Sequence, residues 1–150
     1  MKNTFITDFT TPDFMQAFKS YFAELGVNVK DWEGLFNEMN NDQNNAAYVR
    51  CTGDGKVVGF IQFTPMTMSS WFFEEKIGFI REFWVDCDYR KCGHGSVLLD
   101  LAEERFRSSG IGKAILTTDT ANVFYEKRGY RLDRNIVAKN GDDVYVKALG

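Results

Sequence analysis

The sequence has few of the residues that build metal sites and disulfide frameworks. Its 150 residues include one histidine and three cysteines, and the cysteines form no Cys-x-x-Cys pair. An odd number of cysteines without that spacing predicts reduced thiols rather than disulfides. Only one residue separates Cys92 from the lone histidine, His94, which is not the spacing of a four-ligand zinc site. We therefore expect no metal cofactor.

Clusters of positive charge and long apolar runs are also absent. The formal net charge is −3, and Lys and Arg nowhere form the basic run that is typical of nucleic-acid-binding chains. No stretch approaches the ~20 apolar residues of a membrane-spanning helix, and residues 1–8 lack the apolar core of a signal peptide. We expect a soluble, cytoplasmic protein that has neither nucleic acid nor a membrane as its partner.

The chain does contain enough apolar material for one core. Hydrophobic residues make up 44% of it and aromatic residues 15%. A chain of this length buries roughly two thirds of its unfolded surface on folding. No linker or repeat is visible, so we expect a single domain over residues 1–150.

Hydrophobic periodicity and turn residues predict the order of helices and strands. Helices are expected at residues 11–25, 31–40 (with Asp31 as N-cap), 96–106 and 122–127, and strands at residues 46–52, 56–63, 77–85, 113–118, 130–138 and 144–149. Residues 65–70 indicate a loop, and residues 71–76 fit a loop or a strand extension equally well. This order indicates an α+β fold with a mixed sheet.

A glycine-rich segment joins the strand that ends at Val85 to the helix that begins near Ser96. It reads Arg90-Lys91-Cys92-Gly93-His94-Gly95. At such a junction the first amides of the helix lack intrahelical partners, and glycine lets the backbone approach a ligand closely. This arrangement is typical of a phosphate-binding turn. A tight turn that needs glycine only for its backbone angles is the alternative.

The segment resembles the acyl-CoA loop of the GCN5-related N-acetyltransferases (GNAT family), whose signature is Arg/Gln-x-x-Gly-x-Gly/Ala after a strand ending in valine. Glu82 and the block 124–130 lie on either side of it in the order that the family uses, so the resemblance covers roughly residues 46–150. It implies a central, mostly antiparallel mixed sheet of about six to seven strands, flanked by helices that include two at the N-terminus. It also implies that strands 77–85 and 113–118 are parallel neighbours that splay apart for the cofactor.

The resemblance further implies the cosubstrate, acetyl-CoA, and the residues that bind it. The backbone of residues 83–85 would pair with the pantetheine arm. The cofactor-binding residues expected in this way are Phe83, Trp84, Val85, Arg90, Lys91, Cys92, Gly93, His94, Gly95 and Ser96. The family's proline shortly after the valine is replaced here by Cys87-Asp88, and Thr118 stands where an asparagine is common.

Glu82 is the candidate general base. Strand alternation places it on the same face as Trp84, in a segment otherwise rich in apolar residues. In the resembled family an acid near this place removes the proton of the acceptor amine, and burial would raise its pKa toward a useful value. A glutamate paired with Arg81 is the alternative.

Tyr125 is the candidate general acid. By the resemblance, its phenol would donate a proton to the thiolate of coenzyme A as that group leaves. Because Phe124 and Tyr125 are adjacent on a helix, one can pack in the core while the other faces the cleft. A core tyrosine with a satisfied hydroxyl is the alternative.

The acceptor expected first is a small-molecule primary amine, and a protein or peptide amine is expected second. A non-catalytic acyl-CoA-binding module is the alternative from another class. The last strand, residues 144–149, is expected at an exposed sheet edge, through which a homodimer could form.

Overall fold

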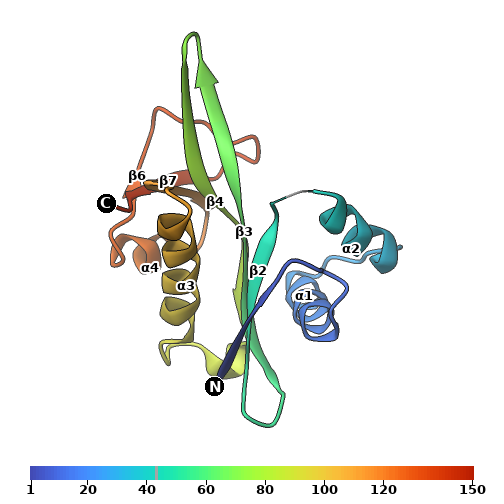
Figure 1. Ribbon diagram of the computed structural model, residues 1–150. Coiled ribbons are helices and arrows are strands. Elements are labelled where there is room, and N and C mark those ends of the chain that lie inside the picture. Colours follow the sequence, from blue (N-terminus) through green and yellow to red (C-terminus); the bar gives the residue numbers. More distant parts are fainter. Residues whose placement is uncertain (43) are drawn as a thin grey trace. The chain divides into compact units, whose positions relative to one another are not determined.

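The computed structural model describes residues 1–42 and 44–150 (Figure 1). Its strands form a seven-stranded sheet in the order β1-β2-β3-β4-β5-β7-β6. Strands β4 and β5 are parallel, and the pairs β1–β2, β2–β3, β5–β7 and β6–β7 are antiparallel. The elements are β1 (Lys2–Ile6), α1 (Pro12–Leu25), α2 (Trp32–Asn41), β2 (Ala46–Cys51), β3 (Val57–Ser70), β4 (Phe73–Val85), the short 3-10 helix η1 (Cys87–Tyr89), α3 (His94–Ser108), β5 (Lys113–Thr118), α4 (Asn122–Glu126), β6 (Arg131–Leu132) and β7 (Asp143–Ala148). The predicted α+β fold with a mixed sheet and two N-terminal helices is confirmed.

The chain divides into two compact units. The first comprises Met1–Thr64 and Arg81–Ala102, and the second comprises Pro65–Ile80 and Glu103–Gly150. Strands β3 and β4 and helix α3 each contribute to both units. The expectation of a single domain stays a prediction. Among the described residues, no helix is long and apolar enough to cross a membrane.

The core of the first unit lies between α1, α2 and the sheet. Helix α1 begins at Pro12 and ends at Gly26, whose φ of +73° is a left-handed conformation that favours glycine. Phe14 and Phe18 of α1 are buried against Phe36 of α2 and Phe60 of β3, with ring centroids 5.4 to 6.0 Å apart. Aromatic packing therefore fixes both helices on this face of β2 and β3.

Helix α2 begins as its sequence predicts, because the Asp31 carboxylate accepts a hydrogen bond from the Gly34 amide at 2.9 Å. Within the same unit, β3 and β4 approach closely at Gly59. A Cβ at this position would overlap the carbonyl oxygen of Trp84. Glycine thus allows the end of β4 to lie directly against β3.

The second unit contains the parallel pair that the sequence predicted. Gly78 of β4 lies opposite Ala114 of β5, and Phe79 lies opposite Ile115. A Cβ on Gly78 would overlap the Phe106 ring, so the end of α3 packs directly on β4. Beyond Phe79, β4 continues into the other unit, and the expected separation of the two strands stays a prediction.

Several predicted boundaries are wrong. Residues 65–70 form the end of β3 rather than a loop, and β4 begins at Phe73, so residues 71–72 form the turn of a long hairpin. Pro65 and the pair Ser69-Ser70 are typical of turns and loops, and most of the segment is exposed, so its sequence resembles a loop. Strand β1 was not predicted, and the strand expected at 130–138 is reduced to β6.

The expected sheet edge is also wrong. Strand β7 lies between β5 and β6 and pairs with both, since Val146 is opposite Ile115 on one side and Arg131 on the other. The edge position that the sequence assigned to residues 144–149 belongs to the short β6. The strand that was expected to form a homodimer through an exposed edge is therefore not an edge strand.

Candidate active site

Glu82 lies on β4 in the first unit and faces α1. The Tyr21 hydroxyl donates a hydrogen bond of 2.6 Å to Glu82 Oε2. Trp84 is buried in the core cluster that also contains α1, so the strand places both side chains on one face, as alternation predicted. Arg81 forms its ion pair with Asp42 at 3.1 Å. In the structure, Arg81 therefore pairs with Asp42 and not with Glu82, as the alternative had it.

Burial raises the pKa of the Glu82 carboxyl above its ordinary value. The hydrogen bond from Tyr21 and the positive charge of Arg81 lower that pKa, but less than burial raises it. A carboxylate with a raised pKa is a better proton acceptor once it is ionised. The pKa of Glu82 is thus shifted in the direction expected of a candidate general base.

The glycine-rich segment follows the end of β4, also in the first unit. The Asp86 amide donates to the Val58 carbonyl at 2.8 Å, which holds the start of the loop against β3. Lys91 and Gly93 both have left-handed backbones, with φ of +62° and +88°. The conformation of Gly93 by itself requires glycine there, and Lys91 adopts an angle that is uncommon for a residue with a side chain.

Helix α3 begins at His94, two residues before the predicted start. The Val97 amide donates to the Gly93 carbonyl at 3.2 Å and closes the first helical turn. Gly95 lies inside that turn and is not among the glycines with positive φ. The segment therefore ends at a helix N-terminus, where backbone amides and the helix dipole favour an anion.

Arg90 connects this loop to two other elements. Its Nε donates to the Val85 carbonyl at 2.8 Å, and its terminal nitrogen lies 2.6 and 2.7 Å from the two carboxylate oxygens of Glu24. Glu24 lies in the last turn of α1. The guanidinium thus ties the loop to the ends of β4 and α1 in this structure.

His94 is held by β2. The Arg50 guanidinium donates to His94 Nδ1 at 2.9 Å and also to Asn3 of β1 at 2.8 Å. Partial burial and the positive charge of Arg50 lower the pKa of the imidazole. His94 is therefore neutral at physiological pH, with its proton on Nε2.

Tyr125 lies on α4 in the second unit and is 7% exposed. Its ring packs edge-on against Phe124 and Tyr130, with centroids 5.2 and 5.7 Å away. Burial raises the pKa of the Tyr125 phenol, so it keeps its proton at neutral pH. Of the adjacent pair, Tyr125 is the more buried, while Phe124 lies under the guanidinium of Arg128 at 3.9 Å.

A buried polar cluster in the second unit, formed by Glu103, Tyr130 and Lys147, was not predicted from the sequence. Glu103 of α3 is 2% exposed and accepts hydrogen bonds from the Tyr130 hydroxyl at 2.9 Å and from Lys147 Nζ at 2.8 Å. A usable signal exists, since Glu103 stands in the helical stripe of Leu99 and Phe106. Tyr21 offers no such signal, because an aromatic residue on the inner face of α1 is ordinary core.

Among the described residues, one group of potential metal ligands places its atoms within 4.8 Å of one another. It consists of Asp86, Cys87 and Asp88. The Asp86 carboxylate already accepts a hydrogen bond from the Asp88 amide at 2.9 Å, which caps η1. The group is thus explained by the local turn.

The fold is shared with known acetyltransferases. An aminoglycoside 6′-N-acetyltransferase complexed with coenzyme A superposes with a TM-score of 0.74 at 18% identity, covering 100% of this chain and 98% of that one. Tetrahymena GCN5 matches with a TM-score of 0.70 at 14% identity over 100% and 97%. An aminoglycoside acetyltransferase from an uncultured soil metagenomic sample matches with a TM-score of 0.73 at 19% identity over 91% and 92%. These identities establish likeness of fold alone.

No relative was found among curated proteins. The family model of the acetyltransferase (GNAT) family, however, matches residues 5–130. This range contains β2 to β5, the end of β1, the four α-helices, the glycine-rich loop and both candidate catalytic residues, and it ends just before β6. The chain therefore belongs to the acetyltransferase (GNAT) family of acyl-CoA-dependent N-acetyltransferases.

Proposed function

We propose that this protein transfers the acetyl group of acetyl-CoA to the primary amine of a small molecule, with Glu82 as the base. The observation that carries the proposal is the Glu82 carboxylate itself, which is half-buried on β4 and accepts a hydrogen bond of 2.6 Å from the Tyr21 hydroxyl. The net charge of −3 also suits a cationic acceptor. Two of the similar structures are aminoglycoside acetyltransferases, which supports a small amine as the acceptor.

The reaction proceeds by direct transfer. Glu82 takes a proton from the acceptor ammonium, directly or through water, and the freed amine attacks the thioester carbonyl. The tetrahedral intermediate then collapses: the carbon–sulfur bond breaks, the sulfur leaves with the electron pair, and the nitrogen loses its second proton to water. Tyr125 donates its phenolic proton to that sulfur, so the products are an amide and the free thiol of coenzyme A.

The role of Tyr125 in this mechanism requires that its phenol is protonated. A phenol whose pKa is raised by burial remains a proton donor throughout the pH range in which an amine is acetylated. The thiolate of coenzyme A needs such a donor, because thiols have a pKa near 8.5 in water. A tyrosine with a purely structural role in the core would be buried in the same way. Kinetic measurements distinguish that role from the role of a general acid.

The donor would bind at the loop before α3. The amides of residues 91–96 and the positive end of the helix would face the pyrophosphate, and the backbone of residues 83–85 would pair with the pantetheine arm. We assign Arg90 the additional role of fixing the loop, because its guanidinium contacts Val85 and Glu24. Cys92 and Ser96 complete the expected contacts.

The experiment has two parts. Calorimetric titration compares acetyl-CoA with NAD and ATP, and a thiol-release assay then screens amines, including polyamines, aminoglycosides and peptides with free N-termini. Selective binding of acetyl-CoA with thiol release on a small amine supports the proposal. Release on peptides alone would favour a protein or peptide N-acetyltransferase instead, and failure to bind acetyl-CoA would overturn the proposed donor site.

A further inference from the structure

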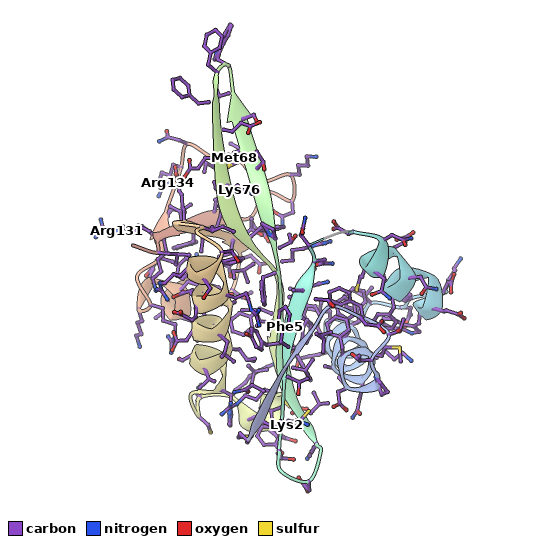
Figure 2. All side chains as sticks on the ribbon, viewed as in Figure 1. Lys2, Phe5, Met68, Lys76, Arg131 and Arg134 are labelled. Carbon is purple, nitrogen blue, oxygen red and sulfur yellow. The ribbon has the colours of Figure 1, made fainter. Side chains whose placement is uncertain are left out.

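The outer part of the β3–β4 hairpin, residues 65–80, belongs to the second unit and ends in exposed aromatic side chains. Trp71, Phe72 and Phe73 are 94%, 95% and 77% exposed. Figure 2 labels Met68 on one strand of this hairpin and Lys76 on the other, and shows the rings at its tip pointing into solvent. Single exposed apolar residues are common, but three consecutive aromatic ones at a turn indicate a contact surface.

The strand that leads to this tip has an open edge. The pairing of β2 with β3 ends where Ala46 lies opposite Phe63, yet β3 continues to Ser70. Over residues 66–70, the described part of the chain gives β3 a strand neighbour only on the β4 side. Such an edge presents backbone donors and acceptors that another strand can pair with.

Over residues 66–70 this edge also lacks the charged and proline side chains that usually protect an edge against association. Proteins place charged side chains on exposed edges to prevent pairing with other chains. From Val57 to Phe73 the sequence contains no Asp, Glu, Lys or Arg. Met68 is 39% exposed in the middle of the open segment. The edge is therefore both unpaired and chemically suited to another uncharged strand.

We propose that this edge of β3 pairs with the same edge of a second copy of the chain, antiparallel and around a two-fold axis near Met68. Antiparallel pairing of a segment with itself is symmetric, so one surface serves both copies. The absence of charge between Val57 and Phe73 means that identical strands meet without repulsion. The aromatic tip of each copy then packs along the hairpin of the other.

The exposed area matches what a dimer needs. Each buried aromatic side chain covers about 150–250 Å². The three tip residues of two copies therefore supply roughly 900–1,500 Å², before the paired strands are counted, and stable interfaces bury about 1,200–2,000 Å² in total. In a monomer the same rings remain in water.

The charges next to the tip argue against a membrane as the occupant. Glu74 and Glu75 follow Phe73 directly, and both are exposed. Cytoplasmic membrane surfaces are anionic and attract basic rather than acidic segments. A second copy, whose edge carries no charge, meets no such barrier.

Sedimentation velocity at several concentrations tests the dimer. The wild-type chain should sediment as a species of twice its 17.2 kDa mass, with the monomer appearing on dilution. Met68→Lys should raise the dimer dissociation constant by about tenfold or more, because the two-fold axis brings two ammonium groups together. Val137→Lys, at a loop residue that is 88% exposed in the same unit, is the matched control and should leave the dimer intact.

A cross-link identifies the surface itself. In a Cys87→Ser/Cys92→Ser background, which removes the exposed thiols, Met68→Cys should form a disulfide-linked dimer on mild oxidation, since opposed residues in antiparallel strands lie within disulfide reach. Val137→Cys in that background should not. A monomer at all concentrations, a dimer unaffected by Met68→Lys, or monomers that bind anionic vesicles through the tip would each overturn the proposal.

Discussion

The hydroxyl of Tyr21 on α1 donates a 2.6 Å hydrogen bond to the carboxylate of Glu82 on β4. This bond favours the ionised carboxylate, while burial favours the neutral one, so the pKa of Glu82 reflects two opposed effects of which burial is larger. A helix that would otherwise only cover the sheet thus also adjusts the ionisation of the candidate base.

Tyr21→Phe should raise the pKa of Glu82 further, because it removes the hydrogen bond and leaves the burial. The acid limb of the kcat/KM profile against pH should move to higher pH, and the activity lost at neutral pH should return at alkaline pH. Steady-state thiol release across the pH range checks this. Tyr48→Phe, which removes a hydroxyl on β2 where the ring stacks on Phe63, should leave the profile unchanged.

Gly95→Ala separates a phosphate-binding turn from a turn that needs glycine only for its angles. Gly95 lies in the first turn of α3 without a positive φ, so alanine should stabilise the helix by up to about 1 kcal/mol. Its methyl group should nevertheless hinder the pyrophosphate and weaken acetyl-CoA binding. We expect a higher Tm together with a Kd raised about tenfold or more, in thermal melts and calorimetry.

Gly112→Ala is the control for Gly95→Ala, since a Cβ there meets nothing within 4 Å and the position lies outside the loop. It should leave the Kd for acetyl-CoA unchanged. If Gly95→Ala also binds acetyl-CoA as wild type does, the loop is not a phosphate cradle.

Much of the fold could be predicted from this sequence because its signals are local. Helix α1 has a proline at its start and a left-handed glycine at its end, α2 has its Asp31 cap, and β5 was placed to the residue. The prediction for the end of β3 was wrong because the local signals there are misleading. Residues 65–70 include Pro65 and the pair Ser69-Ser70, which are typical of loops, and most of them are exposed, so the local signals favour a loop where the structure has a strand.

The candidate site could be predicted only in part. The loop and Glu82 were identifiable because glycine spacing and a carboxylate in an apolar strand both stand out. The partners that adjust them, Tyr21, Glu24 and Arg50, lie 61, 66 and 44 residues from the groups they contact. Such pairings arise from tertiary packing, and no local pattern marks them.

Tyr125→Phe should lower kcat by about a hundredfold, the ordinary contribution of a general acid, while the Kd for acetyl-CoA stays within about twofold. Presteady-state thiol release and calorimetry measure the two quantities. Tyr130→Phe removes another buried hydroxyl, the one that donates to Glu103, and should reduce stability with little effect on kcat. Equal kcat losses in both variants would assign Tyr125 to the core instead.

Glu103→Gln should destabilise the fold. The carboxylate is 2% exposed and neutralises Lys147 at 2.8 Å, so the variant leaves that ammonium partly buried without its counter-charge. We expect the free energy of unfolding to fall by about 2–4 kcal/mol in urea denaturation. Glu104→Gln, at the neighbouring exposed position, should change it by less than about 0.5 kcal/mol. Similar losses in the two variants would contradict a structural role for the buried cluster.

The most direct measurement compares wild type with Glu82→Gln in thiol release and in stability, both against pH. Because the native pKa of Glu82 is raised, ionisation destabilises the native state, and wild-type stability should fall as pH rises from the ordinary pKa of glutamate to that raised value. Glu82→Gln should lack this fall, be at least as stable at neutral pH, and lose about a hundredfold or more in kcat/KM with acetyl-CoA binding preserved. A Glu82→Gln enzyme with wild-type kcat/KM and an unchanged pH profile would contradict the assignment of Glu82 as the base.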